Sequence, residues 1–124
     1  MKVTTDLVCK ELQKIFTEYL DNMRPYIRNL TRKKIIENRA RVLLIRKEYK
    51  TRIADLLTNY GCGYEKTELL DYISYNGKET GYRIARFKIY NSNDSKEEEI
   101  DLTAIVEWDW AGNYKLLSMS IKKD

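Results

Sequence analysis

Residues 32 to 60 form a long stretch without glycine or proline, and this stretch limits the choice of fold more than any other feature. Apolar side chains recur in it at intervals of seven, at Ile35, Val42, Tyr49 and Leu56. That spacing is typical of one buried face of an α-helix. A continuous helix of this size would extend roughly 43 Å, whereas a compact chain of 124 residues has a radius of gyration of roughly 14 Å. The helix therefore spans the whole domain or projects beyond it.

A second helix is predicted near the N-terminus, where Thr4 or Thr5 can cap it. Its apolar residues recur at the three-and-four spacing of one buried face, at Val8, Cys9, Leu12, Ile15, Phe16, Tyr19, Leu20 and Met23. Pro25 predicts a turn or a fresh helical start, because its ring removes a hydrogen-bond donor. Thr31 is then the expected cap of the long helix, and Gly61 its expected stop.

After Gly63 the apolar pattern alternates, which predicts strands over residues 69–75, 82–90 and 100–108 and a last strand with Leu117, Met119 and Ile121 inward. The Asn-Gly pair at 76–77 predicts a tight turn. A change of parity near Ala85 predicts a β-bulge. Residues 91–99 are expected to form a polar loop.

Helices followed by strands predict one α+β domain over residues 1–124. We expect the N-terminal amphipathic helix and the long basic helix to pack on a C-terminal four-stranded antiparallel sheet. This layout resembles that of cystatin-like and NTF2-like folds, without a shared motif. No apolar run exceeds the four residues Val42–Ile45, so neither a signal peptide nor a membrane contact is expected. Two cysteines suit a reducing cytoplasm, and the abundance of Lys, Ile, Asn and Tyr is typical of AT-rich bacterial or phage genomes.

The chain contains no histidine, which removes the commonest general base, the usual nucleophile pairs and the usual zinc ligand. The acidic stretch from Asn93 to Asp101 lacks the residue order of a calcium loop. No glycine-rich phosphate cradle follows a strand. We therefore expect no catalytic residues, no cofactor and no metal site, and a protein that is not an enzyme.

Positive charge is concentrated between residues 24 and 52, which hold eleven basic and two acidic residues for a local net charge of +9. The remaining chain has 12 basic and 17 acidic residues. On a helix, Arg32, Arg39 and Arg46 lie seven apart and so on nearly one side. Such a positive row can bind phosphates, or it can be a solvated face neutralised by the acidic remainder. The candidate contacts with nucleic acid or a partner are Arg32, Arg39, Arg46, Lys47, Lys50 and Trp110.

The first functional hypothesis is a non-enzymatic binding protein whose basic helix, at about 32–60, contacts nucleic acid or a nucleic-acid-binding protein. The alternative is a small protein-interaction module, such as an inhibitor, immunity or anti-defence protein, that acts on an acidic protein partner. A second alternative is a small-molecule pocket between the long helix and the sheet, lined by tyrosine and tryptophan rings. Self-association through the heptad-like spacing stays open.

Overall fold

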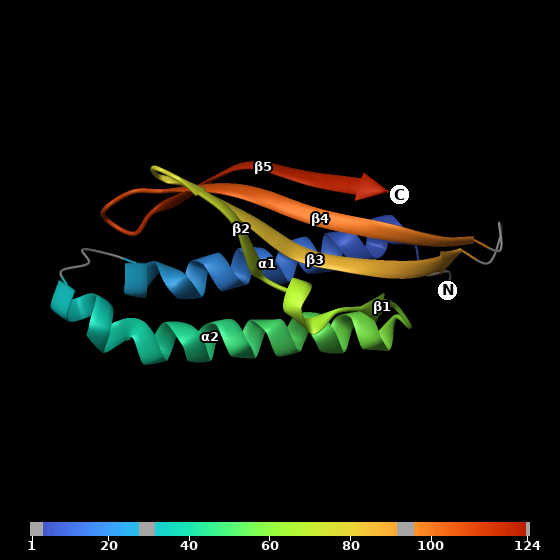
Figure 1. The fold of residues 1–124 in the computed structure, drawn as a ribbon, viewed down its shortest axis with the longest axis horizontal. Helices are drawn as coiled ribbons and strands as arrows, with labels where there is room; N and C mark the ends of the chain where they lie inside the picture. Colours follow the sequence, from blue (N-terminus) through green and yellow to red (C-terminus); the bar gives the residue numbers. More distant parts are fainter. Residues whose placement is uncertain (1–3, 28–31, 92–95, 124) are drawn as a thin grey trace.

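The computed structural model describes residues 4–27, 32–91 and 96–123, which form two layers (Figure 1). One layer consists of the helices α1 (Thr5–Ile27) and α2 (Arg32–Asn59). The other layer is an antiparallel sheet of β1 (Gly63–Tyr64), β2 (Asp71–Asn76), β3 (Glu79–Asn91), β4 (Lys96–Trp108) and β5 (Tyr114–Lys123), with a short 3-10 helix η1 (Lys66–Glu68) after β1. Helices packed on an antiparallel sheet confirm the α+β prediction. Neither described helix carries an apolar stretch long enough to cross a bilayer.

The long helix α2 is continuous and runs beside α1 for most of the length of the molecule (Figure 1). The helix ends at Asn59, and the turn that follows contains Gly61, which adopts φ +71°. The amide of Cys62 donates a hydrogen bond to the carbonyl of Leu57 at 2.8 Å, which closes this turn. At the start of α1 the Thr4 hydroxyl accepts the amide of Leu7 at 3.2 Å, as the cap prediction requires. The expected cap Thr31 lies outside the described residues.

The turn expected at Pro25 is wrong, because α1 continues through it to Ile27. A proline in the last turn of a helix removes only one hydrogen bond. Met23 is buried and Ile27 packs against the core, so side-chain packing on both sides of the proline holds this turn in place.

Strands β2 to β5 form the predicted four-stranded meander, in which β3 and β4 are the longest strands, with 13 residues each. One edge of β3 pairs with β4, and the other edge pairs first with β2 and then with the two-residue β1. The Asn76-Gly77 turn is confirmed, since Asn76 pairs with Glu79 and Gly77 adopts φ +62°. At the edge formed by β1 and β2, β1 lies beside α2 (Figure 1).

Two irregularities set which side chains face the helices. The register shifts between Arg83 and Ala85, which confirms the predicted bulge. A second shift, at Ile105 and Val106, leaves Leu117 without a cross-strand partner. Leu117 and Ile121 were expected to face inward and are instead 39% and 42% exposed. At Leu117 the bulge inserts one extra residue, whereas Ile121 lies opposite Leu102 on the edge strand β5, which is covered on one side only.

The polar loop expected over residues 91–99 is shorter than predicted, because β4 already begins at Lys96. Glu99 lies opposite Lys88, and Glu98 lies opposite the buried Ile89. The opposite charges of Glu99 and Lys88 and the burial of Ile89 on β3 stabilise this extension of β4. Residues 92–95, which include two of the acidic-stretch positions, lie outside the described part of the chain.

The core lies between α1 and the helix-facing side of the sheet. All eight apolar positions predicted for α1 are buried, as are the alternating residues of β4 from Ile100 to Trp108. Among the described side chains of α2, the buried ones are Tyr49, Ile53 and Leu57, all in its C-terminal half. The segment from Ile36 to Leu44 therefore has a larger free surface, on which Ile36 is 69% exposed.

Candidate binding site

Arg46, expected to be a central phosphate contact, makes three contacts within the protein. Its Nε donates to the carbonyl of Leu70 at 3.2 Å, a terminal nitrogen lies 3.7 Å from Asp71, and the guanidinium stands 4.9 Å over the ring of Tyr72. Leu70 adopts φ +48°, a conformation that is strained for a branched side chain. Arg46 therefore holds the start of β2 against α2 at a strained point of the backbone.

The other described arginine of the predicted row has an exposed side chain. Arg39 lies on the same side of α2 as Arg46 and lines a cavity together with Tyr72 of β2. The side chain of Arg32 lies outside the described part of the structure. The side of α2 that carries this row thus faces the edge of the sheet, at least from Arg39 to Arg46.

Lysines from two elements meet in a groove of about 520 Å³ between α2 and the β1–η1 segment. Lys47 and Lys50 come from α2, and Lys66 comes from the first position of η1. The groove also receives Arg46, whereas its acidic member is Asp55. We call this feature the lysine groove, with four basic and one acidic side chain among its described lining residues.

The floor of the lysine groove is apolar. It contains the buried Leu69 and the partly buried Ala54 and Tyr64. The hydroxyl of Tyr64 lies 3.3 Å from that of Thr58, which fixes the ring against the last turns of α2. Cations around a half-buried aromatic ring form a site for an anion that carries a flat apolar group.

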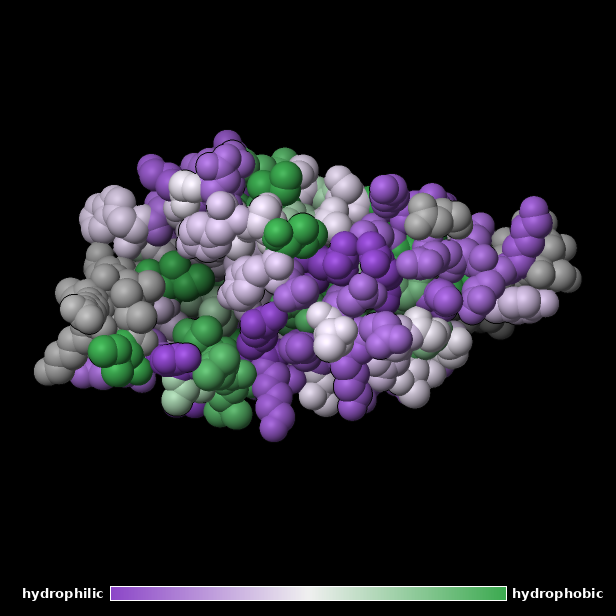
Figure 2. Space-filling model, viewed as in Figure 1, coloured by the Kyte–Doolittle hydropathy of each residue, from purple (hydrophilic) through white to green (hydrophobic). Residues whose placement is uncertain are grey.

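The groove has this shape because α2 ends and the chain reverses at once. The glycine-containing turn after Asn59 returns β1 along α2, and η1 then brings Lys66 into the lining of the same groove as Lys50. Figure 2 shows mainly hydrophilic side chains over this C-terminal half of α2, while apolar ones gather over the N-terminal half. Sequence reasoning identified Lys47 and Lys50 but missed Lys66 and Tyr64, since nothing in their local pattern indicates that they approach the helix.

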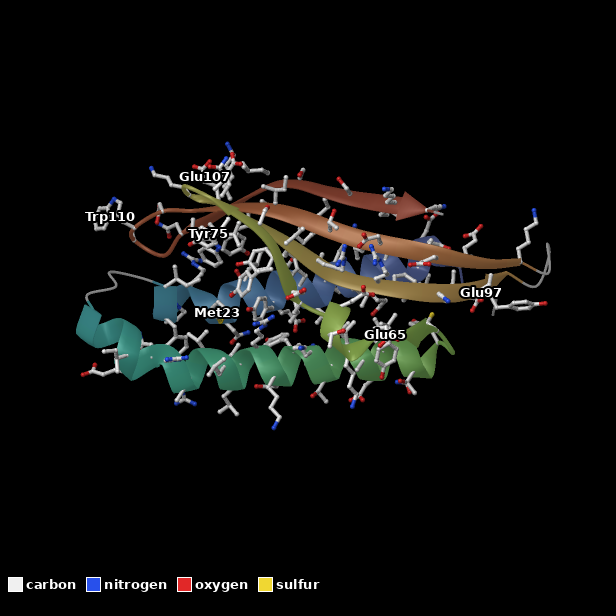
Figure 3. All side chains as sticks on the ribbon, in the orientation of Figure 1. Met23, Glu65, Tyr75, Glu97, Glu107 and Trp110 are labelled. Atoms are coloured by element: carbon white, nitrogen blue, oxygen red, sulfur yellow. The ribbon has the colours of Figure 1, made fainter. Side chains whose placement is uncertain are left out.

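Trp110 lies at the turn between β4 and β5 and is 79% exposed. Figure 3 shows it at one end of the molecule, pointing away from the sheet and the helices. It is not among the lining residues of the lysine groove. Trp110 and the two groove lysines therefore do not converge on one site.

The described residues contain no group of three or more cysteine or carboxylate side chains able to hold a metal ion. Both cysteines are free and buried. Burial, with a smaller effect of Asp6, raises the pKa of Cys9 to about 11, and burial also raises the pKa of Cys62. Neither thiol is activated as a nucleophile, because nucleophilic cysteines have a lowered pKa.

Comparisons with protein-family models, with curated proteins and with solved structures found no match for this chain.

Proposed function

We propose that this protein is a non-enzymatic binding protein whose lysine groove binds the phosphate backbone and one base of single-stranded nucleic acid. The observation that supports the proposal is the convergence of Lys47, Lys50 and Lys66 on a groove with an apolar, aromatic floor. Lysine side chains neutralise phosphates, and an aromatic ring stacks on an unpaired base of any sequence. We also expect the protein to act in the cytoplasm, where its two free thiols stay reduced.

A single strand suits the groove better than a duplex. The lysines line a concave surface and the ring of Tyr64 is half-buried, so a base has to leave its stack to reach it. Arg46 of the arginine row, which a duplex could otherwise contact, is engaged with Leu70 and Asp71. With three lysine contacts, the slope of log affinity against log salt for a single strand is about −2.

The test is fluorescence anisotropy of labelled 20-residue oligonucleotides, with single-stranded DNA, RNA and duplex DNA compared from 50 to 200 mM salt. We expect single strands to bind more tightly than the duplex. We also expect their affinity to fall roughly twentyfold over this salt range, as three phosphate contacts imply. Absence of binding at 50 mM salt would overturn the proposal.

A matched pair of variants separates the groove from the general charge of the protein. One variant replaces Lys47, Lys50 and Lys66 by glutamine, and the control replaces Lys115, Lys122 and Lys123 of β5 in the same way. All three control lysines are exposed and none lines the groove, while both variants lose three positive charges. The groove variant should lose most of the affinity and of the salt slope. Equal loss in both variants would mean that net charge, and not the groove, binds the strand.

An acidic protein partner is the second candidate, and exposed apolar side chains on α2 favour it. Ile36, Leu43 and Leu44 are each more than half exposed on the N-terminal half of the helix. Apolar residues beside basic ones are typical of a helix that docks on another protein. An inhibitor, immunity or anti-defence role would use this surface. A partner that is recovered by pull-down after nuclease treatment, and lost in a variant with Leu44→Glu, which lies outside the lysine groove, would favour this function over the first.

A further inference from the structure

A second cavity, of about 380 Å³, lies at the other end of α2, between the end of α1 and strands β2 to β4. Five aromatic side chains line it, namely Tyr26, Tyr72, Tyr75, Tyr82 and Trp108. Its volume is within the range of small-molecule sites. Figure 3 places two of the lining residues, Met23 and Tyr75, at this end of the molecule, one on α1 and one on β2. We call it the aromatic cavity.

Thr80 supplies a polar group to this cavity that nothing in the described protein satisfies. The residue is 1% exposed, and its hydroxyl has no hydrogen-bond partner among the described groups. Its backbone pairs with Tyr75 on one side and Val106 on the other, so the strand cannot turn the side chain to solvent. A buried hydroxyl without a hydrogen-bond partner destabilises the folded protein, so a ligand that supplies the missing hydrogen bond gains affinity.

Tyr82 adds a hydrogen-bond donor beside it. Its hydroxyl accepts Nε1–H of Trp108 at 3.3 Å, which leaves the Tyr82 proton for an acceptor. Burial, and the nearby Tyr72, raise the pKa of Tyr82 well above its usual range, so this proton is present at neutral pH. The rings of Tyr72 and Tyr82 lie 5.2 Å apart and form one wall against which a flat group can pack.

Arg39 provides the charge at the cavity. Its side chain is exposed, and it makes no ion pair with the part of the chain that the structure describes. No acidic residue is among the described lining residues of this cavity. Guanidinium groups bind carboxylates through two parallel hydrogen bonds. An anionic group at the entrance is therefore complementary to the site.

We propose that the aromatic cavity is a binding site for a small aromatic carboxylate, whose ring lies between Tyr72, Tyr75 and Trp108. Its carboxylate pairs with Arg39, and an N–H or O–H group on its ring donates to the unpartnered hydroxyl of Thr80. This site goes beyond the proposed nucleic-acid function and does not depend on it, because none of these residues lines the lysine groove.

The test is a titration of the ¹⁵N-labelled protein with indole-3-acetate, followed by the indole N–H signals of its two tryptophans. Trp108 lines the cavity, whereas Trp110 is exposed and does not, so it serves as an internal control. We expect a saturable shift of the Trp108 signal, with a Kd on the order of 1 mM or tighter for a ligand of this size. Tryptamine has the same ring and the opposite charge and should bind at least tenfold more weakly. No saturable shift at Trp108, or equal binding of tryptamine, would overturn the proposal.

Two variants test the polar groups. Arg39→Gln and Thr80→Val should each weaken indole-3-acetate binding several-fold to tenfold, while the signal dispersion of the folded protein is kept. The matched controls are Arg41→Gln, exposed on the same helix, and Thr103→Val on β4; neither residue lines the cavity. Unchanged affinity in both test variants, or the same loss in the controls, would overturn the assignment of Arg39 and Thr80.

Discussion

Replacing Thr80 by valine should stabilise the protein in the absence of any ligand. The side chain is 1% exposed and its hydroxyl is unpartnered among the described groups. An unsatisfied buried hydroxyl costs about 1–3 kcal/mol. Valine has nearly the same shape, is β-branched, and keeps the backbone pairing of the strand. We therefore expect the free energy of unfolding to rise by about 1–2 kcal/mol. This is less than the full cost of the unsatisfied hydroxyl, because the methyl group that replaces it has to fit among the packed rings.

The assay is equilibrium unfolding in urea, with thermal unfolding as a second measurement. For a domain of this size the expected gain corresponds to a rise in Tm of about 5 °C and a higher urea midpoint, with an unchanged m-value. Thr103→Val is the control, since Thr103 is only partly buried on the neighbouring strand, and its stability should change by less than about 0.5 kcal/mol.

A loss of stability on Thr80→Val would refute the reasoning, because it would mean that the hydroxyl already has a partner in solution. The combination with the ligand titration is more telling than either measurement alone. A group that is kept for binding should give a variant that is more stable and binds more weakly. A group that is kept for packing or folding should give a variant that is less stable.

Three further predictions follow from the ion pairs and thiols. Arg46→Gln should lower the free energy of unfolding in urea by about 1–2 kcal/mol, because the bond to the Leu70 carbonyl and the stacked cation are lost; an unchanged midpoint would contradict this role. Burial acts to raise the pKa of Asp101, but its two arginine partners outweigh it and lower that pKa, so its stabilisation is present at neutral pH and is lost as the pH falls below about 4. Asp101→Asn should thus lower Tm at pH 7 by more than it does in acid, and a difference that persists undiminished as the pH falls would argue against the ion pairs. Cys9 and Cys62 should react with a thiol reagent far more slowly in the native protein than in urea, and rapid native labelling would show that they are not buried.

The fold was largely predictable because its signals are local. The three-and-four spacing in α1 identified every one of its buried apolar residues, and strict alternation identified the inner face of β4. The expected turn at Pro25 failed because packing further along the helix outweighed the loss of one hydrogen bond. The inward position of Leu117 failed because a bulge on the strand pair, which has no signature in that segment, changes the parity.

The sites were less predictable because they depend on which elements become neighbours. Lys66 and Tyr64 reach the lysine groove only because β1 and η1 pack along α2. The aromatic cavity takes its walls from two helices and three strands, so no single stretch of sequence contains its pattern. Thr80 reads as an ordinary strand residue, and its unpartnered hydroxyl is visible only when its surroundings are known.

The chemistry of arginine and lysine explains why the formal charge of the basic segment overstates what a partner meets. A guanidinium is planar and weakly hydrated, and it can pair with a carboxylate and stack on a ring at once, whereas an ammonium keeps its water. Arg46 and Arg52 both do so, with Arg52 bound to Glu18 at 2.7 Å and placed over the ring of Tyr49. Lys47 and Lys50, from the same helix, make no ion pair with the described residues. Among the described basic residues of α2, the charges of Arg46 and Arg52 are thus engaged within the protein, whereas Arg39, Arg41, Lys47 and Lys50 make no ion pair with the described residues, so a count that treats all basic residues alike overstates the charge that a ligand meets.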